Sequence, residues 1–134
     1  MVEALLHAFR ATHYLVCLDE IEWADIRVDQ TLPASLQALV GKSAWGFITA
    51  WNPLATERPE AENLAAQYEL HAALRQLPNA IIRPAIGVGS DWHEPSLFVI
   101  GTDTAALDTL ARRHRQLAYV HGESDTPALL SVLR

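Results

Sequence analysis

A continuous apolar run over residues 45–51 constrains the fold of this chain more than any other feature. The run is dense in aromatic and β-branched side chains and stops at Asn52-Pro53. Because proline disfavours helical geometry in the residue before it, this pattern predicts a strand that ends near Asn52. An unbroken apolar run is typical of a strand that is covered on both faces. We therefore expect a central strand with a polar loop at its end.

A long amphipathic helix is expected after this loop, over residues 59–77. Its apolar side chains fall within one arc of the helical wheel, about 100° wide, and Asn63 falls in the same arc near the start of the helix. Pro78 follows the helix and ends it. An amide on the core face needs hydrogen-bond partners whatever its function. Asn63 is therefore either a ligand contact or a buttress for the preceding loop.

From residue 45 onwards the expected elements follow the order β-α-β-β-α-β. This order is typical of the split unit of ferredoxin-like α+β folds. It predicts an α+β fold with a ferredoxin-like core over residues 45–121, to which an N-terminal helix and a β-hairpin are added. The expected strands cover residues 13–18, 24–28, 45–51, 80–88, 95–101, 117–120 and 129–133. The expected helices cover residues 2–12, 33–40 and 59–77, and a last one starts at Thr102 or Asp103.

The rule of right-handed crossovers predicts which ends of these elements meet. The end of the first core strand, the start of the long helix and the start of the third core strand fall at the same edge of the sheet. We therefore expect five polar residues to lie close together there, with Gln116 beside them as a further ligand contact. These five residues are Asn52, Glu62, Asn63, Glu94 and Ser96.

Length and composition restrict the classes of function. A chain of 134 residues predicts a single globular domain over residues 1–134. The net charge of −6 disfavours non-specific nucleic-acid binding, and the aromatic motif of RNA-binding domains is absent. The sequence shows neither a membrane-spanning run nor a signal peptide, and the single cysteine, Cys17, is typical of a reducing compartment. We expect a cytoplasmic monomer or homodimer that binds neither nucleic acid nor membranes.

Catalytic and metal-binding patterns are sparse. The six histidines lack the spacing of paired ligands on a helix, and one cysteine cannot form a thiolate site, so we expect neither a metal nor another cofactor. A nucleophile elbow, a P-loop and a dinucleotide-binding glycine pattern are also absent. Glu94 and Ser96 would share one face of a strand, with His93 on the other. The candidate catalytic groups are Glu62 and Glu94, as acid and base.

Three functions remain open at this point. The leading hypothesis is a non-catalytic module that binds a small polar ligand or a protein partner at the polar edge of the sheet. The alternative is a small acid/base enzyme, a hydrolase or transferase, in which Glu62 and Glu94 face each other across a pocket and Asn52 positions the substrate. The third is an accessory or immunity-type protein whose polar cluster is purely structural. An aromatic rim made by Trp51 and Trp92 would favour the binding module.

An ordered set of short motifs runs through most of the chain. They are residues 48–53 (Ile-Thr-Ala-Trp-Asn-Pro), Glu62-Asn63, Glu94-Pro95-Ser96 and residues 116–118 (Gln-Leu-Ala). In this order they resemble a small bacterial family that is known as a domain of unknown function, DUF3293. The resemblance implies the fold and marks these residues, but it implies no activity. Two departures from the family pattern are Gln67, in place of an asparagine, and His114-Arg115-Gln116, in place of an aromatic-Gly-Gln sequence.

Overall fold

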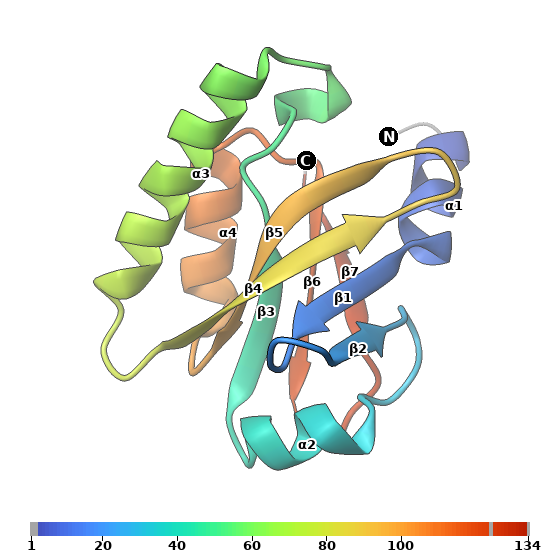
Figure 1. The fold of residues 1–134 in the computed structure, drawn as a ribbon, viewed down its shortest axis with the longest axis vertical. Coiled ribbons are helices and arrows are strands. Elements are labelled where there is room, and N and C mark those ends of the chain that lie inside the picture. Colours follow the sequence, from blue (N-terminus) through green and yellow to red (C-terminus); the bar gives the residue numbers. More distant parts are fainter. Residues whose placement is uncertain (1–2, 124, 134) are drawn as a thin grey trace.

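A computed structural model describes residues 3–123 and 125–133 of the chain. All seven strands of the described residues form one antiparallel sheet in the order β2-β1-β4-β5-β3-β6-β7 (Figure 1). The strands are β1 (His13–Cys17), β2 (Trp23–Ile26), β3 (Ala44–Ile48), β4 (Ile81–Val88), β5 (His93–Ile100), β6 (Ala118–Glu123) and β7 (Leu129–Val132). The helices are α1 (Glu3–Ala11), α2 (Ala34–Val40), α3 (Glu60–Arg75) and α4 (Thr104–Arg113), with a short 3₁₀ turn at Pro53–Ala55.

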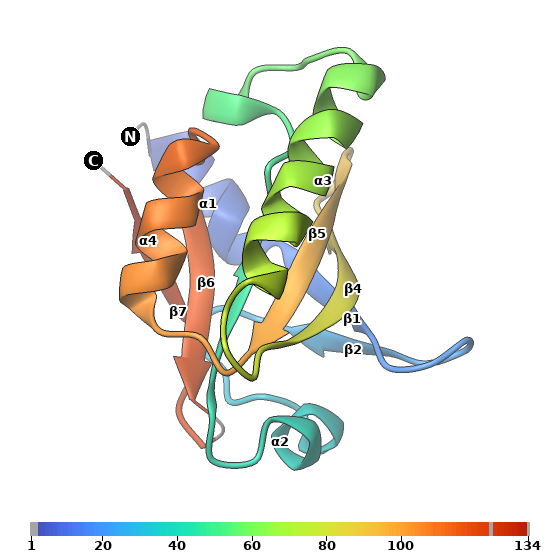
Figure 2. The same cartoon turned by 90° about the vertical axis from the view of Figure 1, so that its left-hand side faces the viewer.

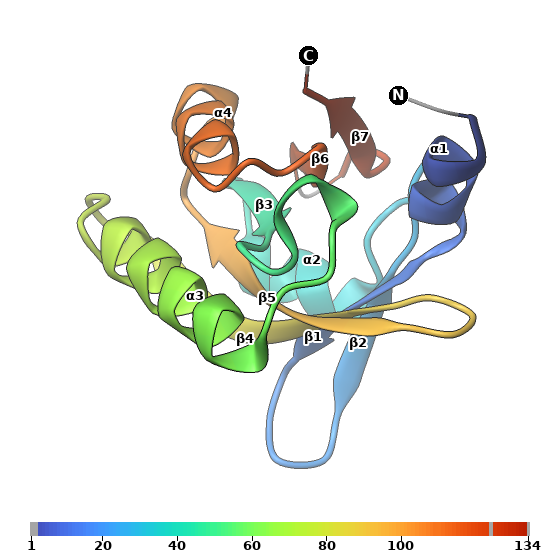
Figure 3. The same ribbon diagram turned by 90° about the horizontal axis from the view of Figure 1, so that it is seen from above.

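The sheet is curled into a half-barrel. The segment after β2 meets the segment before β7 through two β-bridges, Val28 with Ala128 and Thr31 with Pro127. Since β2 and β7 are the two edges of the sheet, these bridges draw its edges towards each other, as the view in Figure 3 shows. Helices α3 and α4 cover the outer face side by side (Figure 2). Helix α2 lies at one end of the curled sheet and α1 lies towards the other (Figure 1).

Two hydrophobic cores lie on opposite faces of the sheet. Strand β5 contributes to both because its side chains alternate in direction. Phe98 and Ile100 point into the half-barrel, and Leu97 and Val99 point towards the helices. The inner core also contains Tyr14, Trp45, Phe47 and Val120. The outer core contains Ile48, Leu70, Leu74, Leu107, Leu110 and Tyr119.

The mixed α/β class is confirmed, and each expected element is present with ends within three residues of the predicted ones. Strand β3 pairs with β5 and with β6, and the N-terminal hairpin forms. The sheet is larger than the expected four-stranded core, however, because β1 pairs with the outer edge of β4 and β7 pairs with β6. No helix in the part of the chain described is both long and apolar enough to cross a membrane.

Candidate functional site

The loop that follows β3 has an unusual backbone conformation. Asn52, Leu54 and Ala55 all have positive φ angles, of 46°, 57° and 56°. Left-handed geometry costs roughly 1–2 kcal/mol for each residue that carries a Cβ, although asparagine tolerates it better than most. Such a conformation persists only where the surrounding contacts hold it in place. The loop therefore needs specific partners.

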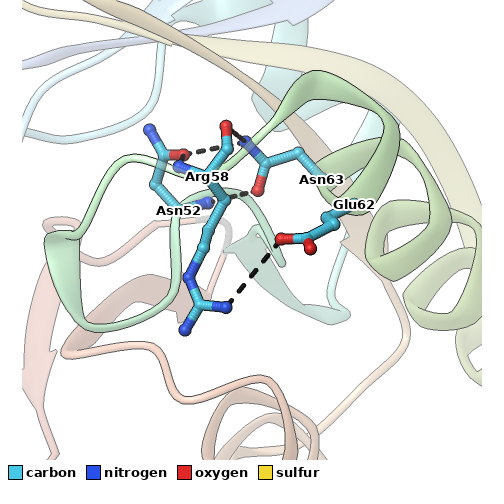
Figure 4. Close-up of polar contacts among 4 residues, drawn as sticks. All are labelled: Asn52, Arg58, Glu62 and Asn63. Atoms are coloured by element: carbon cyan, nitrogen blue, oxygen red, sulfur yellow. Dashed lines mark hydrogen bonds and ion pairs between the residues drawn. The ribbon is translucent and has the colours of Figure 1, made fainter.

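Asn63, on the first turn of α3, supplies those partners (Figure 4). Its Oδ1 accepts a hydrogen bond from the backbone N–H of Asn52 at 2.9 Å. Its Nδ2 donates to Oδ1 of Asn52 at 2.8 Å and to the carbonyl of Arg58 at 3.3 Å. Because Asn63 is only 2% exposed, its amide is satisfied by the loop rather than by water. This geometry fits the buttress alternative for Asn63.

Glu62 lies beside this corner, next to Arg58 (Figure 4). Its Oε2 lies 3.9 Å from Nη1 of Arg58, and its side chain is 61% exposed. An exposed ion pair of this length contributes little stability. Glu62 lines neither of the cavities that Glu94 lines, so the two carboxyl groups do not face each other across a pocket as the enzyme alternative expects.

Gln67 joins the end of β3 to the start of β5. Its Oε1 accepts the backbone N–H of Ala50 at 2.9 Å, and its Nε2 donates to the carbonyl of Pro95 at 3.2 Å. The sequence marked this residue only as a departure from an asparagine. In the structure, its amide joins the segment just after β3, which carries Thr49, to the start of β5, which carries Glu94.

Glu94 lies at the open end of the half-barrel, on the inward-facing stripe of β5. It separates two cavities. The inner cavity has a volume of about 40 Å³, enough for a few water molecules or one small polar group. The outer cavity has a volume of about 240 Å³. Groups that line the inner cavity include Tyr14, Phe47, Thr49, Ser96, Gln116 and Val120. Groups that line the outer cavity include Leu5, Ala8, Phe9, Asn52, Trp92 and His93.

The carboxyl group of Glu94 has no compensating partner in residues 3–123 and 125–133. Burial raises its pKa from 4.5 to about 7, because desolvation disfavours the charged form. Among the residues that the structure describes, none forms a hydrogen bond or an ion pair with this carboxyl. The nearby phenol of Tyr14 has its own pKa raised, mainly by burial and further by the negative charge of Glu94. The site therefore holds a carboxyl that changes charge near neutral pH.

Arg115 adopts a left-handed conformation, with φ of 52°, at the position where the resemblance seen in the sequence implies a glycine. Glycine adopts this geometry without a steric penalty, whereas arginine does not. The carbonyl of Arg115 accepts a hydrogen bond from the N–H of Leu54 at 2.8 Å. This backbone contact forms here without a glycine, and it holds the strained loop at Leu54, whereas Asn63 holds it at Asn52 and Arg58.

A comparison with protein families identifies the chain. Residues 48–119, more than half of its 134 residues, match the model described as "Protein of unknown function (DUF3293)". The chain belongs to this family. The matched segment contains both the Asn52–Asn63 corner and Glu94, and it confirms the resemblance seen in the motifs. No curated protein and no solved structure matches the chain.

The structure brings most of the expected site residues to one end of the sheet but divides them into two groups. Asn52 and Glu94 line the outer cavity, and Ser96 and Gln116 line the inner cavity together with Glu94. Asn63 and Glu62 belong to the loop corner. No three potential metal-ligating side chains gather within residues 3–123 and 125–133. The sequence did not predict a role in the site for four residues that line the inner cavity, Phe9, Tyr14, Phe47 and Thr49.

Proposed function

We propose that this protein is a non-catalytic module that binds a small polar ligand in the two cavities around Glu94. The observation that supports this most is the Glu94 carboxyl, which is partly buried, lines both cavities and has no partner among the described residues. Buried polar groups in folded proteins almost always have a partner. A group held without one lowers stability, and such groups are commonly retained for function.

In this proposal the expected site residues have different roles. Glu94, Ser96 and Gln116 contact the ligand from the sheet, and Asn52 contacts it at the mouth of the outer cavity. Asn63 acts indirectly, because its hydrogen bonds shape the loop that presents Asn52, and Glu62 lies outside the cavities beside Arg58. We also infer that β4-β5-β3-β6 with α3 and α4 act as a ferredoxin-like split unit, whose crossovers bring these groups to one edge.

The cavities favour a small ligand over a flat protein partner. The inner cavity is narrow, and the aromatic side chains of Phe9 and Trp92 line it together with the outer cavity. Ligand sites of this kind are concave and mostly apolar, with a few polar groups that fix the orientation of the ligand. The carboxyl of Glu94 provides the fixed polar point.

Acid–base catalysis by Glu94 is the second candidate. A carboxyl with a pKa of about 7 suits a general acid or base at neutral pH. Ser96 does not form a nucleophile–base pair with this group, because its hydroxyl donates to the backbone carbonyl of Glu94 at 3.1 Å. The separation of Glu62 from the cavities also removes the second carboxyl that this mechanism needs. Binding is therefore the better supported proposal.

A fragment screen tests the proposal. Amide spectra of the ¹⁵N-labelled protein are recorded with a library of small cationic, neutral and anionic fragments. We expect at least one fragment to shift the amide signals of cavity residues, such as Gly87 and Glu94, and to lose this effect in Glu94→Leu. The matched control is Glu20→Gln, an exposed carboxyl in the β1–β2 turn, which should bind as wild type does. If no fragment of any charge shifts the cavity signals, the proposal is wrong.

A further inference from the structure

The hydroxyl and side-chain amide groups that line the inner cavity donate their protons to other groups of the protein. Tyr14 donates its hydroxyl proton to the carbonyl of Phe9 at 2.6 Å. Thr49 donates to the carbonyl of Pro95 at 2.8 Å, and Ser96 donates to that of Glu94 at 3.1 Å. The wall therefore presents the lone pairs of these oxygens rather than their protons.

Gln116 follows the same pattern. Its Nε2 donates to the carbonyl of Trp51 at 3.2 Å and to that of His114 at 3.3 Å. An amide nitrogen carries two protons, so both are in use. Within the described part of the chain, the Oε1 atom of Gln116 accepts no hydrogen bond. It adds another acceptor to a cavity that already holds a carboxyl.

The indole of Trp92 does not change this balance. A Cβ built on Gly87, which lines the inner cavity, would lie 3.8 Å from Cζ3 on the benzo ring of Trp92. A Cβ built on Gly89 would clash with Nε1 of the same indole. The N–H edge therefore lies over the turn between β4 and β5, and the benzo edge lies towards the cavity. Trp92 contributes an aromatic surface to the site, not a donor.

Positive charge is also scarce around Glu94. The other titratable side chains that line the two cavities are Tyr14 from β1 and Tyr119 from β6, in the inner cavity, and His93 from β5, in the outer cavity. No lysine or arginine lines either cavity in the residues that can be described. The charge of Arg27, on the segment after β2, lowers the pKa of Tyr14, whereas the raised pKa of Glu94 has burial as its cause. A ligand must therefore bring both the protons and the positive charge.

We propose that the ligand is a small organic cation, a primary amine in its ammonium form, whose head enters the inner cavity and donates to Glu94 and the surrounding oxygens. This inference rests on the proposed function. An ammonium group has three donors and no acceptor, which complements a wall of acceptors. The inner cavity accommodates such a head and little more. The aromatic faces of Phe9 and Trp92 suit a cation on its way in, and the outer cavity holds the apolar body.

The outer cavity adds one point of specificity. Oδ1 of Asn52 accepts hydrogen bonds from the Arg58 N–H and from Nδ2 of Asn63. Its Nδ2 atom donates to no described residue. An acceptor atom on the body of the amine, such as a hydroxyl or carbonyl oxygen, would therefore find a donor in Asn52 at the mouth.

Binding of an ammonium group is coupled to ionisation of Glu94. The cation binds the carboxylate better than the protonated acid, so its affinity rises as pH rises through the pKa of Glu94, about 7. Between pH 6 and pH 8 the ionised fraction increases roughly tenfold, and the affinity should follow it. Histidines also change charge in this range. His93→Gln should keep the tenfold rise, whereas Glu94→Gln should abolish it.

The test uses n-butylammonium, butyramide and butyrate, three probes of similar size that differ in charge. Each is titrated into the ¹⁵N-labelled protein at pH 6, 7 and 8. We expect n-butylammonium to shift the cavity amides, with affinity that rises about tenfold from pH 6 to pH 8 and falls at least tenfold in Glu94→Gln at pH 8.

Each other outcome overturns the inference in a distinguishable way. If butyrate or butyramide binds the cavity and n-butylammonium does not, the ligand is not a cation, although the cavity remains a binding site. If n-butylammonium binds equally well to Glu94→Gln, the carboxyl does not recognise it. If none of the three probes binds and the fragment library also fails, the proposed function is wrong and the cation inference fails with it.

Discussion

The Asn52–Asn63 corner and the Glu94 cavity are two polar regions at the same end of the sheet, and they differ in how far their polar groups are satisfied. At the corner, Asn63 makes three hydrogen bonds to residues of the neighbouring loop. In the cavity, Glu94 is desolvated and has no partner among the described residues. Asn63 is buried and Glu94 is partly buried, and both regions lie within the family match.

The difference shows that a gathering of polar residues does not by itself identify a site. Asn63 stabilises a loop with left-handed residues, so the polar groups of the corner have a structural role. The ionised Glu94 carboxyl destabilises the free protein, so a structural role does not explain the presence of this group in the cavity. The variants below separate a structural cluster from a functional one.

The largest expected effect comes from the core that supports both regions. Leu70 of α3 is fully buried between the helix and the sheet. Leu70→Ala should lower the free energy of unfolding by about 2–5 kcal/mol, because it leaves a cavity. The measurement is a urea denaturation curve. An unchanged midpoint would mean that α3 does not pack on the sheet as described. The corner and the cavity would then not share one supporting core.

Truncation of Asn63 at the corner should cause the second largest decrease in the free energy of unfolding. Asn63→Ala removes partners from Asn52 and Arg58, at about 1–3 kcal/mol for each group left unsatisfied. Asn63→Leu extends the apolar face of α3 but removes the same hydrogen bonds, so we expect it also to melt well below wild type. Thermal melts of both variants check this. If Asn63→Leu were as stable as wild type, Asn63 would not be needed for stability, and a role in ligand binding would explain it better.

Replacing the polar group of the cavity, Glu94, should raise the free energy of unfolding at neutral pH, whereas replacing Asn63 at the corner should lower it. Because the folded-state pKa of Glu94 lies above its ordinary value, the native state holds a proton that the unfolded state has released. Wild type should therefore lose stability as pH rises from about 4.5 to 7, and keep that loss above pH 7. Glu94→Gln should not show this decrease in the free energy of unfolding. We expect the decrease in wild type to be about 2 kcal/mol, a value that is reduced because the group is partly exposed.

Urea curves at pH 5 and pH 8 measure this difference. Glu20→Gln, which removes an exposed carboxyl of the β1–β2 turn, is the matched control and should follow wild type at both pH values. Equal pH dependence in Glu94→Gln and wild type would show that Glu94 is solvated or paired, and the contrast with the corner would disappear.

The smallest effect concerns the other support of the loop. Arg115 has a positive φ, so Arg115→Gly should raise the free energy of unfolding by about 0.5–1 kcal/mol, as steric strain is relieved against the greater freedom of the unfolded chain. Arg113→Gly, at the last residue of α4, is the control and should lower stability by up to about 1 kcal/mol. Stabilities measured in urea would contradict this account if both glycines lowered stability equally.

Local patterns in the sequence were sufficient for the elements and for the pairing of β3 with β5, because apolar periodicity and the crossover rule depend on short segments. They did not predict that β1 would pair with β4 or that the segments at Val28 and Ala128 would meet. Such contacts join residues far apart in the chain and leave no local signature. The curl they produce creates the cavities, which is why the roles of Tyr14 and Thr49 could not be predicted.

The site shows the same division. The motifs marked Asn52, Asn63 and Glu94 alike, since each is polar and lies at the end of an element. Whether an amide or a carboxyl is satisfied depends on atoms contributed by other segments, such as the Arg58 carbonyl beside Asn63. The sequence therefore predicted where a site would be, and only the hydrogen-bond pattern distinguishes the buttress from the candidate binding group.

The protonation state of the Glu94 carboxyl near neutral pH decides most directly whether the cavity holds a candidate binding group. Its side-chain ¹³C chemical shift can be followed by NMR from pH 3 to pH 9, with the signal assigned by its absence from Glu94→Gln. We predict a titration midpoint near 7, which n-butylammonium moves to lower pH. A midpoint near 4.5 would contradict the account, because it would show a solvated or already paired carboxyl in the cavity.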